Sequence, residues 1–128
     1  MDLEERINRS ESHIVRTIFP NTTNHRNTLF GGTALSWMDE IAFITATRFC
    51  RQPLVTVSID KTDFKKPIPS RTIADIIGRV VKVGRTSLQV KVDIYIEQMD
   101  SDHRELAIEG LITMVAVDDD MKPVPIKQ

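Results

Sequence analysis

The chain has 128 residues, which is enough for one compact domain with a single core and too few for a second independent one. Its 17 basic and 18 acidic residues nearly cancel, so no overall field attracts nucleic acid or an anionic membrane, and an anionic ligand needs a local cluster of charge. The one cysteine, Cys50, excludes an intrachain disulfide, a zinc ribbon and a CxxC redox motif, and fits a reducing, cytoplasmic environment.

The first segments of the chain indicate neither membrane insertion nor secretion. Residues 1–12 are charged and lack a continuous apolar run, which argues against a signal peptide or anchor. No apolar stretch approaches the roughly 20 residues that cross a bilayer. His13–Phe19 then has the pattern of a short strand that Pro20 closes. The Asn/Thr-rich residues 21–28 favour side-chain to backbone hydrogen bonds, which predicts an irregular loop of the kind that often carries function.

One long helix is predicted over Thr33–Phe49, directly after the pair Gly31–Gly32. Apolar and small residues recur there at spacings of three and four, which makes one continuous face that a sheet can cover. The members of this face are Leu35, Met38, Ala42, Thr45, Ala46 and Phe49. The helix ends before Pro53, because the residue that precedes a proline avoids the helical region.

The rest of the chain predicts strands with short connections. Four segments are rich in β-branched and apolar residues: Leu54–Phe64, Ile73–Val83, Ser87–Glu97 and Glu105–Val117. Strict alternation in Ser87–Glu97 predicts one buried and one wet face, and Gly84–Arg85 supplies a tight turn before it. Connections this short leave no room for helical crossovers, so the strands are expected to be antiparallel. The tail Met121–Gln128, with two prolines, is expected to be extended and loosely held.

Asp39 is the first residue with a candidate chemical role, because aspartate is a poor helix-interior residue. Its neighbours three and four positions away are mostly small or apolar, so we expect its carboxylate on or near the buried face. A carboxylate in that position suits a general base. The alternative is that Asp39 and Glu40 mark the solvated edge of the helix and pair with basic residues.

Gly31–Gly32 precede the predicted helix, where unpaired N–H groups and the positive end of the dipole can hold a developing oxyanion. The alternative is that the pair allows a tight turn or close helix packing. Asn24 could hydrogen-bond a water or a carbonyl, although asparagine in such a loop is usually a turn former. His25 is the nearby candidate base.

The cysteine, the histidines and the basic residues give weaker indications of function. Cys50 could be a nucleophile, but it ends an apolar helical stretch, and a buried or bystander thiol is the simpler interpretation. No pair of histidines has metal-ligand spacing with an acidic partner, so neither a metal nor another cofactor is indicated. Basic residues near the predicted hairpin could hold phosphates or keep a sheet edge soluble. They are Lys65, Lys66, Arg71, Arg79, Lys82 and Arg85.

Taken together, four features resemble a single family: Asn24, Leu29–Gly32, Trp37–Glu40 and Lys82–Ser87. The chain is similar to the hotdog-fold acyl-CoA thioesterases of the YciA and cytosolic brain acyl-CoA hydrolase type. The likeness covers residues 14–117, and the order of these motifs is more specific than any one of them. It implies an α+β hotdog fold, in which a curved antiparallel sheet of five or six strands wraps around one long central helix, as a single domain over residues 1–128.

The resemblance also implies an activity and an assembly. The protein would hydrolyse fatty acyl-CoA to free acid and CoA without a cofactor. It would form a homodimer whose sheets join edge to edge, commonly built further into a trimer of dimers, with the active site at the dimer interface. Asp39 of one subunit would face Asn24 of the other.

The roles of the site residues follow from the same resemblance. Asp39 would act as a general base on water or as a nucleophile that forms an anhydride, and the sequence leaves both open. Asn24 would position the water or the thioester, while Gly31 and Gly32 place backbone donors near the carbonyl oxygen. Contacts to CoA are assigned to Arg85, Thr86 and Ser87 at its nucleotide end, with Lys66 and Arg26 as further contacts.

Two departures from the family pattern affect these expectations. Arg26 and Asn27 stand where the family often has a small residue and then glycine, and Asn27 can adopt the same left-handed conformation. Phe43, one turn beyond Asp39, stands where the family usually has a small residue. Its ring could shorten the acyl pocket or tighten the dimer.

Two other functions remain as alternatives. A hotdog hydratase or dehydratase would need an acid–base pair that includes histidine, and His25 is the only histidine near the predicted site. A non-catalytic acyl-CoA sensor of this fold usually carries an added DNA-binding domain, for which no residues are left over in this sequence. Replacement of Asp39 separates these cases, because a sensor would keep its response to ligand.

Overall fold

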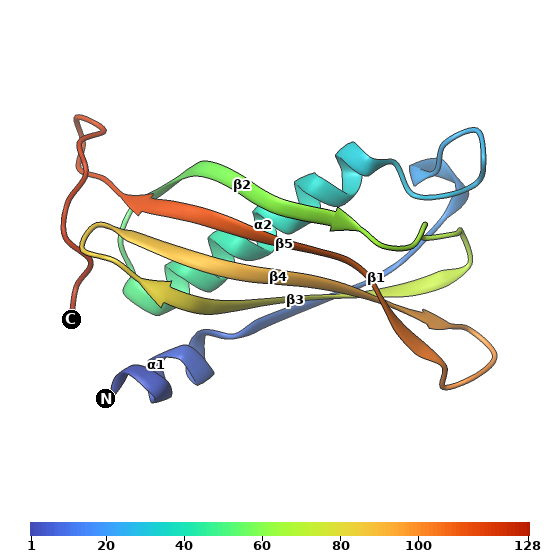
Figure 1. Cartoon of the computed structure of the whole chain (residues 1–128), viewed down its shortest axis with the longest axis horizontal. Helices are drawn as coiled ribbons and strands as arrows, with labels where there is room; N and C mark the ends of the chain where they lie inside the picture. Colours follow the sequence, from blue (N-terminus) through green and yellow to red (C-terminus); the bar gives the residue numbers. More distant parts are fainter.

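The computed structural model describes residues 1–128 as one β-sheet packed against a single long helix (Figure 1). The elements are α1 (Leu3–Ser10), β1 (Ser12–Thr17), the 3-10 turn η1 (Pro20–Thr22), α2 (Gly31–Cys50), β2 (Leu54–Phe64), β3 (Thr72–Val83), β4 (Ser87–Gln98) and β5 (Arg104–Ala116). The five strands are antiparallel in the order β1-β3-β4-β5-β2, and α2 lies across one face. The predicted α+β arrangement is therefore confirmed. No helix has the length and apolar character that a membrane span requires.

The core lies between α2 and the sheet, and the predicted periodicities identify most of it. Met38, Ala42, Thr45 and Ala46 on α2 are completely buried, as the spacing of three and four indicated. On β4 the strict alternation is observed, with every second residue from Leu88 inward and the intervening residues partly exposed. Each large apolar side chain buried in this way contributes about 1.5–3 kcal/mol.

α2 approaches the sheet most closely at Gly78 of β3. A Cβ atom on this glycine would lie 2.5 Å from Oγ1 of Thr45 and 3.2 Å from Cγ1 of Ile41. Both helix residues are completely buried, and Oγ1 of Thr45 has no hydrogen-bond partner. Glycine at this position therefore sets how closely the helix packs on the strand.

The two ends of the chain differ from expectation. The charged segment 1–12 contains α1, whose first turn is capped where Glu5 N–H donates to the Asp2 carboxylate at 2.8 Å. The tail after Met121 is extended, but the expectation that it is loosely held was wrong. The backbone N–H of Val124 donates to Ala116, that of Ile126 donates to Arg85, and the Ile126 side chain is buried.

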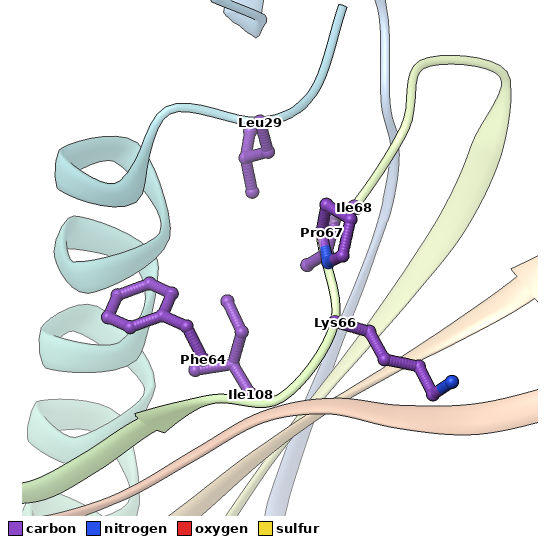
Figure 2. Close-up of a pocket in the computed structure, with 6 residues that line it drawn as sticks. All are labelled: Leu29, Phe64, Lys66, Pro67, Ile68 and Ile108. Atoms are coloured by element: carbon purple, nitrogen blue, oxygen red, sulfur yellow. The ribbon is translucent and has the colours of Figure 1, made fainter. Parts of the chain in front are cut away.

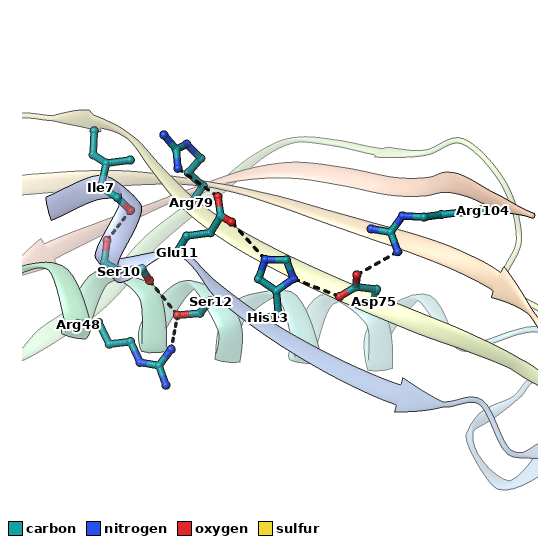
Figure 3. Close-up of polar contacts among 9 residues, drawn as sticks. All are labelled: Ile7, Ser10, Glu11, Ser12, His13, Arg48, Asp75, Arg79 and Arg104. Carbon is teal, nitrogen blue, oxygen red and sulfur yellow. Dashed lines mark hydrogen bonds and ion pairs between the residues drawn. The ribbon is translucent and has the colours of Figure 1, made fainter. Parts of the chain in front are cut away.

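A polar network joins the start of β1 to β3 on the outer side of the sheet (Figure 3). The His13 ring lies between two carboxylates, 3.2 Å from Glu11 and 3.5 Å from Asp75. Arg79 contacts Glu11 at 3.1 Å, and Arg104 contacts Asp75 at 3.0 Å. The hydrogen bond from His13, together with Arg79, lowers the pKa of Glu11 despite its partial burial. These contacts fix β1 and the end of α1 on the sheet.

β1 and β2 are the two edges of the sheet. β2 is the longer edge, with 11 residues, and on one side its backbone has no neighbouring strand. It also carries exposed apolar side chains at Val57, Ile59 and Phe64, and Phe43 on α2 is 48% exposed. A long unpaired edge with apolar side chains is a template for pairing with another chain.

Candidate functional site

The N-terminal end of α2 presents three free backbone donors. The helix begins at Gly31, so the two glycines form its first turn and do not precede it as predicted. Phe30 gives no side-chain cap, and the first backbone donor with an acceptor is Ala34, whose N–H donates to Phe30 at 3.0 Å. The N–H groups of Gly31, Gly32 and Thr33 are therefore available to a ligand oxygen, at the positive end of the helix dipole.

The structure gives no conformational reason for the two glycines. Neither has a positive φ, so no left-handed turn requires them. A Cβ on Gly32 would meet no atom within 4 Å, and one on Gly31 would make only ordinary contact with the Phe64 ring at 3.7 Å. Their effect is to leave the backbone bare at the exposed start of the helix.

Asn24 has a double role in the loop before α2. Its side-chain oxygen accepts hydrogen bonds from the backbone N–H of Arg26 at 2.9 Å and from the N–H and hydroxyl of Thr28 at 3.2 and 3.1 Å. The turn-forming interpretation is thus correct for this oxygen. The side-chain NH₂ group has no partner and remains a free donor. Asn27 adopts the left-handed conformation, with φ of 61°, as its sequence position indicated.

Asp39 of α2 is half-buried, and its side chain faces β2. The Thr56 hydroxyl of β2 donates to its Oδ1 at 2.6 Å, and no group hydrogen-bonds Oδ2. The neighbouring Glu40 behaves differently, since it is exposed and pairs with Arg16 at 2.6 Å. The solvated-edge interpretation therefore holds for Glu40, while Asp39 is oriented by a strand residue and keeps one free oxygen.

Thr56 was not singled out in the sequence. Its hydrogen bond to Asp39 joins residues 17 positions apart on different elements. The periodicity within a single helix or strand cannot predict such a contact. The sequence did contain one indication. Residues two apart in a strand share a face, so Thr56 lies on the same face of β2 as the buried Leu54.

The predicted residues gather at two separate ends of the chain. Asn24, Arg26 and Gly31–Gly32 lie at the end where α2 begins (Figure 1). The turn Arg85–Ser87 joins β3 to β4 at the other end, beside the C-terminal tail. Asp39 lies between them, about 12 Å along the helix from Gly31 at 1.5 Å per residue. One chain alone therefore does not bring these groups around a single small substrate.

A mostly apolar cavity of about 290 Å³ opens beside the start of α2 (Figure 2). It is lined by Leu29, Phe64, Lys66, Pro67, Ile68 and Ile108. The Phe64 ring that borders it is also the group that a Cβ on Gly31 would contact. Lys66 is the one charged lining residue, and its ammonium pairs with Glu105 at 3.4 Å. The cavity can take an apolar arm of a ligand next to the free N–H groups.

The structure does not support a catalytic role for Cys50 or His25. Cys50 is buried at the end of α2, its thiol donates to the Ala46 carbonyl at 3.4 Å, and burial raises the pKa of the thiol. A nucleophilic role for Cys50 is therefore not supported. His25 is exposed in the loop and makes neither a hydrogen bond nor an ion pair with a carboxylate. No three His, Cys, Asp or Glu side chains are grouped to hold a metal ion.

The chain is similar in sequence to known proteins. A sequence model of the thioesterase superfamily matches residues 26–102. The chain is 43% identical over 118 residues to an uncharacterized acyl-CoA thioester hydrolase, YkhA, of Bacillus subtilis, covering 91% of this chain and 69% of that protein.

Two solved structures are similarly close. An acyl-CoA hydrolase from Staphylococcus aureus, in complex with butyryl-CoA, CoA and CoA disulfide, superposes with a TM-score of 0.89 at 38% identity, covering 94% of this chain and 73% of that one. It was also solved with an asparagine, a threonine or an aspartate replaced by alanine. A hexameric acyl-CoA thioesterase gives a TM-score of 0.91 at 38% identity, covering 95% of this chain and 78% of that one. The predicted hotdog fold is confirmed, and the chain belongs to the thioesterase superfamily.

Proposed function

We propose that this protein hydrolyses fatty acyl-CoA to the free acid and CoA, at a site that two copies of the chain build together. The observation that carries the proposal is Asp39, a half-buried carboxylate with one oxygen held by Thr56 and the other free, in a helix whose first turn has three free N–H groups. This combination supplies a base or nucleophile and an oxyanion site, which thioester hydrolysis requires.

Each step of the hydrolysis is assigned to a particular group of the protein. Asp39 either removes a proton from the attacking water or attacks the thioester carbonyl itself to form an anhydride that water then cleaves. Negative charge that develops on the carbonyl oxygen is taken by the N–H groups of Gly31 and Gly32. The free NH₂ group of Asn24 orients the water or the thioester. The carbon–sulfur bond breaks, and CoA leaves as its thiolate, which takes up a proton.

The separation along α2 supports a shared site. About 12 Å lies between Asp39 and the first N–H groups of its own helix, which is too far for both to act on one carbonyl. The exposed apolar edge of β2 offers the place for a second copy. A two-fold axis there reverses the direction of the partner and brings the turn Arg85–Ser87 of the partner to the end where Gly31 lies. We therefore propose a homodimer, built further into a trimer of dimers, with Asp39 of one chain facing Asn24 of the other.

The alanine variants of the S. aureus hydrolase lend further support. Their asparagine, aspartate and threonine are separated along the chain by the same intervals as Asn24, Asp39 and Thr56. That protein is solved with CoA bound. We infer that these three residues of the present chain act together on the thioester.

The rest of the substrate is assigned by charge and polarity. Arg85, Thr86 and Ser87 contact the nucleotide end of CoA, and Arg26 and Lys66 are further candidates near the start of α2. The apolar cavity beside Phe64 and Ile108 takes an apolar arm of the substrate. A cytoplasmic location, where acyl-CoA is available, completes the proposal.

A panel of short, medium and long acyl-CoAs tests the function directly. The purified protein is expected to release CoA from at least part of the panel, and the rates give the preferred chain length. Inactivity across the whole panel would contradict the proposal. Hydration of an enoyl-CoA without CoA release would favour the hydratase alternative, and ligand binding without turnover would favour a sensor.

Mixed dimers test the shared site. Asn24→Ala and Asp39→Ala are each expected to inactivate the protein, but subunits refolded together in equal amounts should regain about a quarter of the wild-type rate. Half of the dimers are then mixed, and each mixed dimer has one site with both residues intact. A mixture that stays inactive, while mass spectrometry shows mixed dimers, would place Asn24 and Asp39 in the same subunit's site.

Gly32→Ala tests the oxyanion role of the helix start. A helical Cβ points toward the N-terminus, so the new methyl group stands in the open space before the free N–H groups. We expect kcat to fall about tenfold or more. The thermal unfolding midpoint should stay the same or rise, because the methyl meets no protein atom within 4 Å and alanine favours helix over glycine. An unchanged kcat would remove these donors from the mechanism.

A further inference from the structure

Three arginines line one cavity at the end of α2 opposite the free N–H groups. The cavity has a volume of about 450 Å³, and its lining consists of Arg9, Arg48 and Arg51 alone. Arg9 lies in the last turn of α1, Arg48 in the last turn of α2, and Arg51 directly follows that helix. The proposed thioesterase chemistry uses none of them.

These guanidinium groups have no carboxylate partners. Arg16, Arg79 and Arg104 elsewhere in the chain each contact at least one acidic side chain within 4 Å. Arg9, Arg48 and Arg51 contact none, although the chain as a whole has a net charge of −1. Three positive charges are thus concentrated without a carboxylate partner in a nearly neutral protein.

Helix dipoles account for only part of this charge. α1 and α2 both end here, and the C-terminal end of a helix carries about −0.5 of an elementary charge. The two ends together offset about one positive charge of three. The surplus is available to an external anion.

One guanidinium group is held in place, and the backbone of a second arginine is fixed. Arg48 donates to the hydroxyl of Ser12 at 2.9 Å, and Ser12 is 2% exposed and in turn donates to the Ser10 carbonyl (Figure 3). Arg51 has a left-handed backbone, with φ of 52°, and its N–H closes the last turn of α2 on Thr47 at 2.7 Å. Fixed positions lower the entropic cost of binding a ligand.

Two further cavities extend from this one toward the β3–β4 turn. A neighbouring cavity shares Arg9 and Arg51 and adds Arg6 and Lys127. Arg6 is fixed, because it donates to the carbonyls of Phe49 and Lys127 at 3.0 and 2.9 Å. A third cavity shares Arg6 with the second and reaches Gly84. The three cavities are thus linked by shared arginines, although the third is lined mostly by apolar residues and Arg6 is its only basic side chain.

We propose that Arg9, Arg48 and Arg51 form a binding site for a phosphorylated anion, distinct from the contacts assigned to Arg85–Ser87. Guanidinium groups bind phosphate oxygens in pairs, and three of them around one cavity suit a group with two or more phosphates. The phosphates come either from CoA itself or from a separate polyphosphate.

The binding test uses inorganic pyrophosphate and the variant Arg9→Gln/Arg51→Asn, with asparagine chosen because it tolerates the left-handed backbone. Its matched control is Arg71→Asn, since Arg71 is also exposed, left-handed with φ of 66° and without an acidic partner. Calorimetry is expected to show that wild type and control bind pyrophosphate equally, that the double variant binds at least about tenfold more weakly, and that added salt weakens binding. Equal affinity in all three proteins, or no binding to wild type at millimolar pyrophosphate, would overturn the proposal.

A second pair of measurements identifies the source of the phosphates. If the site takes the phosphates of CoA, saturating CoA abolishes pyrophosphate binding and the double variant raises KM for acyl-CoA. If it takes a separate anion, pyrophosphate still binds to the CoA-saturated protein and KM does not change. Because binding is measured without turnover, the outcome does not depend on whether the protein hydrolyses acyl-CoA.

Discussion

Replacement of Asp39 by asparagine is expected to lower kcat for CoA release by about a hundred- to ten-thousand-fold, the range that a general base or nucleophile contributes. Asparagine keeps the shape of the side chain and can still accept the hydrogen bond from Thr56, so the fold should be preserved. The change removes only the charged, basic oxygen. Initial rates at saturating acyl-CoA, together with the thermal unfolding midpoint, separate loss of chemistry from loss of structure.

The adjacent residue supplies the control for this experiment. Glu40→Gln changes the same charge one position away, but Glu40 is exposed and pairs only with Arg16 at the surface. Such exposed pairs contribute at most about 1 kcal/mol, so kcat is expected to stay within about twofold of wild type. If Asp39→Asn retained more than a tenth of the wild-type rate, another group would have to be the catalyst.

The largest effect on stability is expected from Gly78→Ala. The new methyl group would lie 2.5 Å from Oγ1 of Thr45, and overpacking of this kind costs about 1–3 kcal/mol. The gain from replacing a strand glycine, about 0.5–1 kcal/mol, is smaller and does not reverse the sign. Urea unfolding at one fixed protein concentration measures the loss, since any association makes stability depend on concentration.

A second substitution tests whether the contact with Thr45 is the cause. Thr45→Ala removes the hydroxyl, which has no hydrogen-bond partner, together with the buried γ-methyl group, so this change alone is expected to cost about 1 kcal/mol for the lost methyl. The double variant Gly78→Ala/Thr45→Ala is expected to be more stable than Gly78→Ala. Equal stability of the two would assign the cost to Ile41, whose Cγ1 and carbonyl oxygen remain 3.2 and 3.3 Å away.

Elements with strong local periodicity could be predicted from the sequence. The alternation of Ser87–Glu97 and the helical face around Met38 each depend on neighbours within one element, and both are observed. α1 was missed because half of its residues are charged and it depends on distant contacts. One of these is Arg6, whose guanidinium lies 4.2 Å from the Phe49 ring centroid. The tail was misjudged for the same reason, since the backbone of Ile126 is held by Arg85 from another hairpin.

The candidate site could be predicted only in part. Residue types and motif order drew attention to Asn24, Asp39 and the two glycines, and the structure gives each a free donor or acceptor. Thr56 was missed because its bond to Asp39 crosses from strand to helix. Sequence spacing also could not reveal that the turn after β3 lies far from the start of α2 in a single chain, because that separation follows from strand length and direction.

The burial of Cys50 has a practical consequence for measuring turnover. Hydrolysis of a thioester releases a free thiol, which a chromogenic disulfide reagent detects by a change in absorbance. The only sulfhydryl of the polypeptide itself is 5% exposed and is kept in its unreactive, protonated form by its raised pKa. In an assay with the folded protein, all of the reagent that reacts can therefore be counted as released CoA. Reaction of one further thiol per chain would show that the C-terminal end of α2 has unfolded.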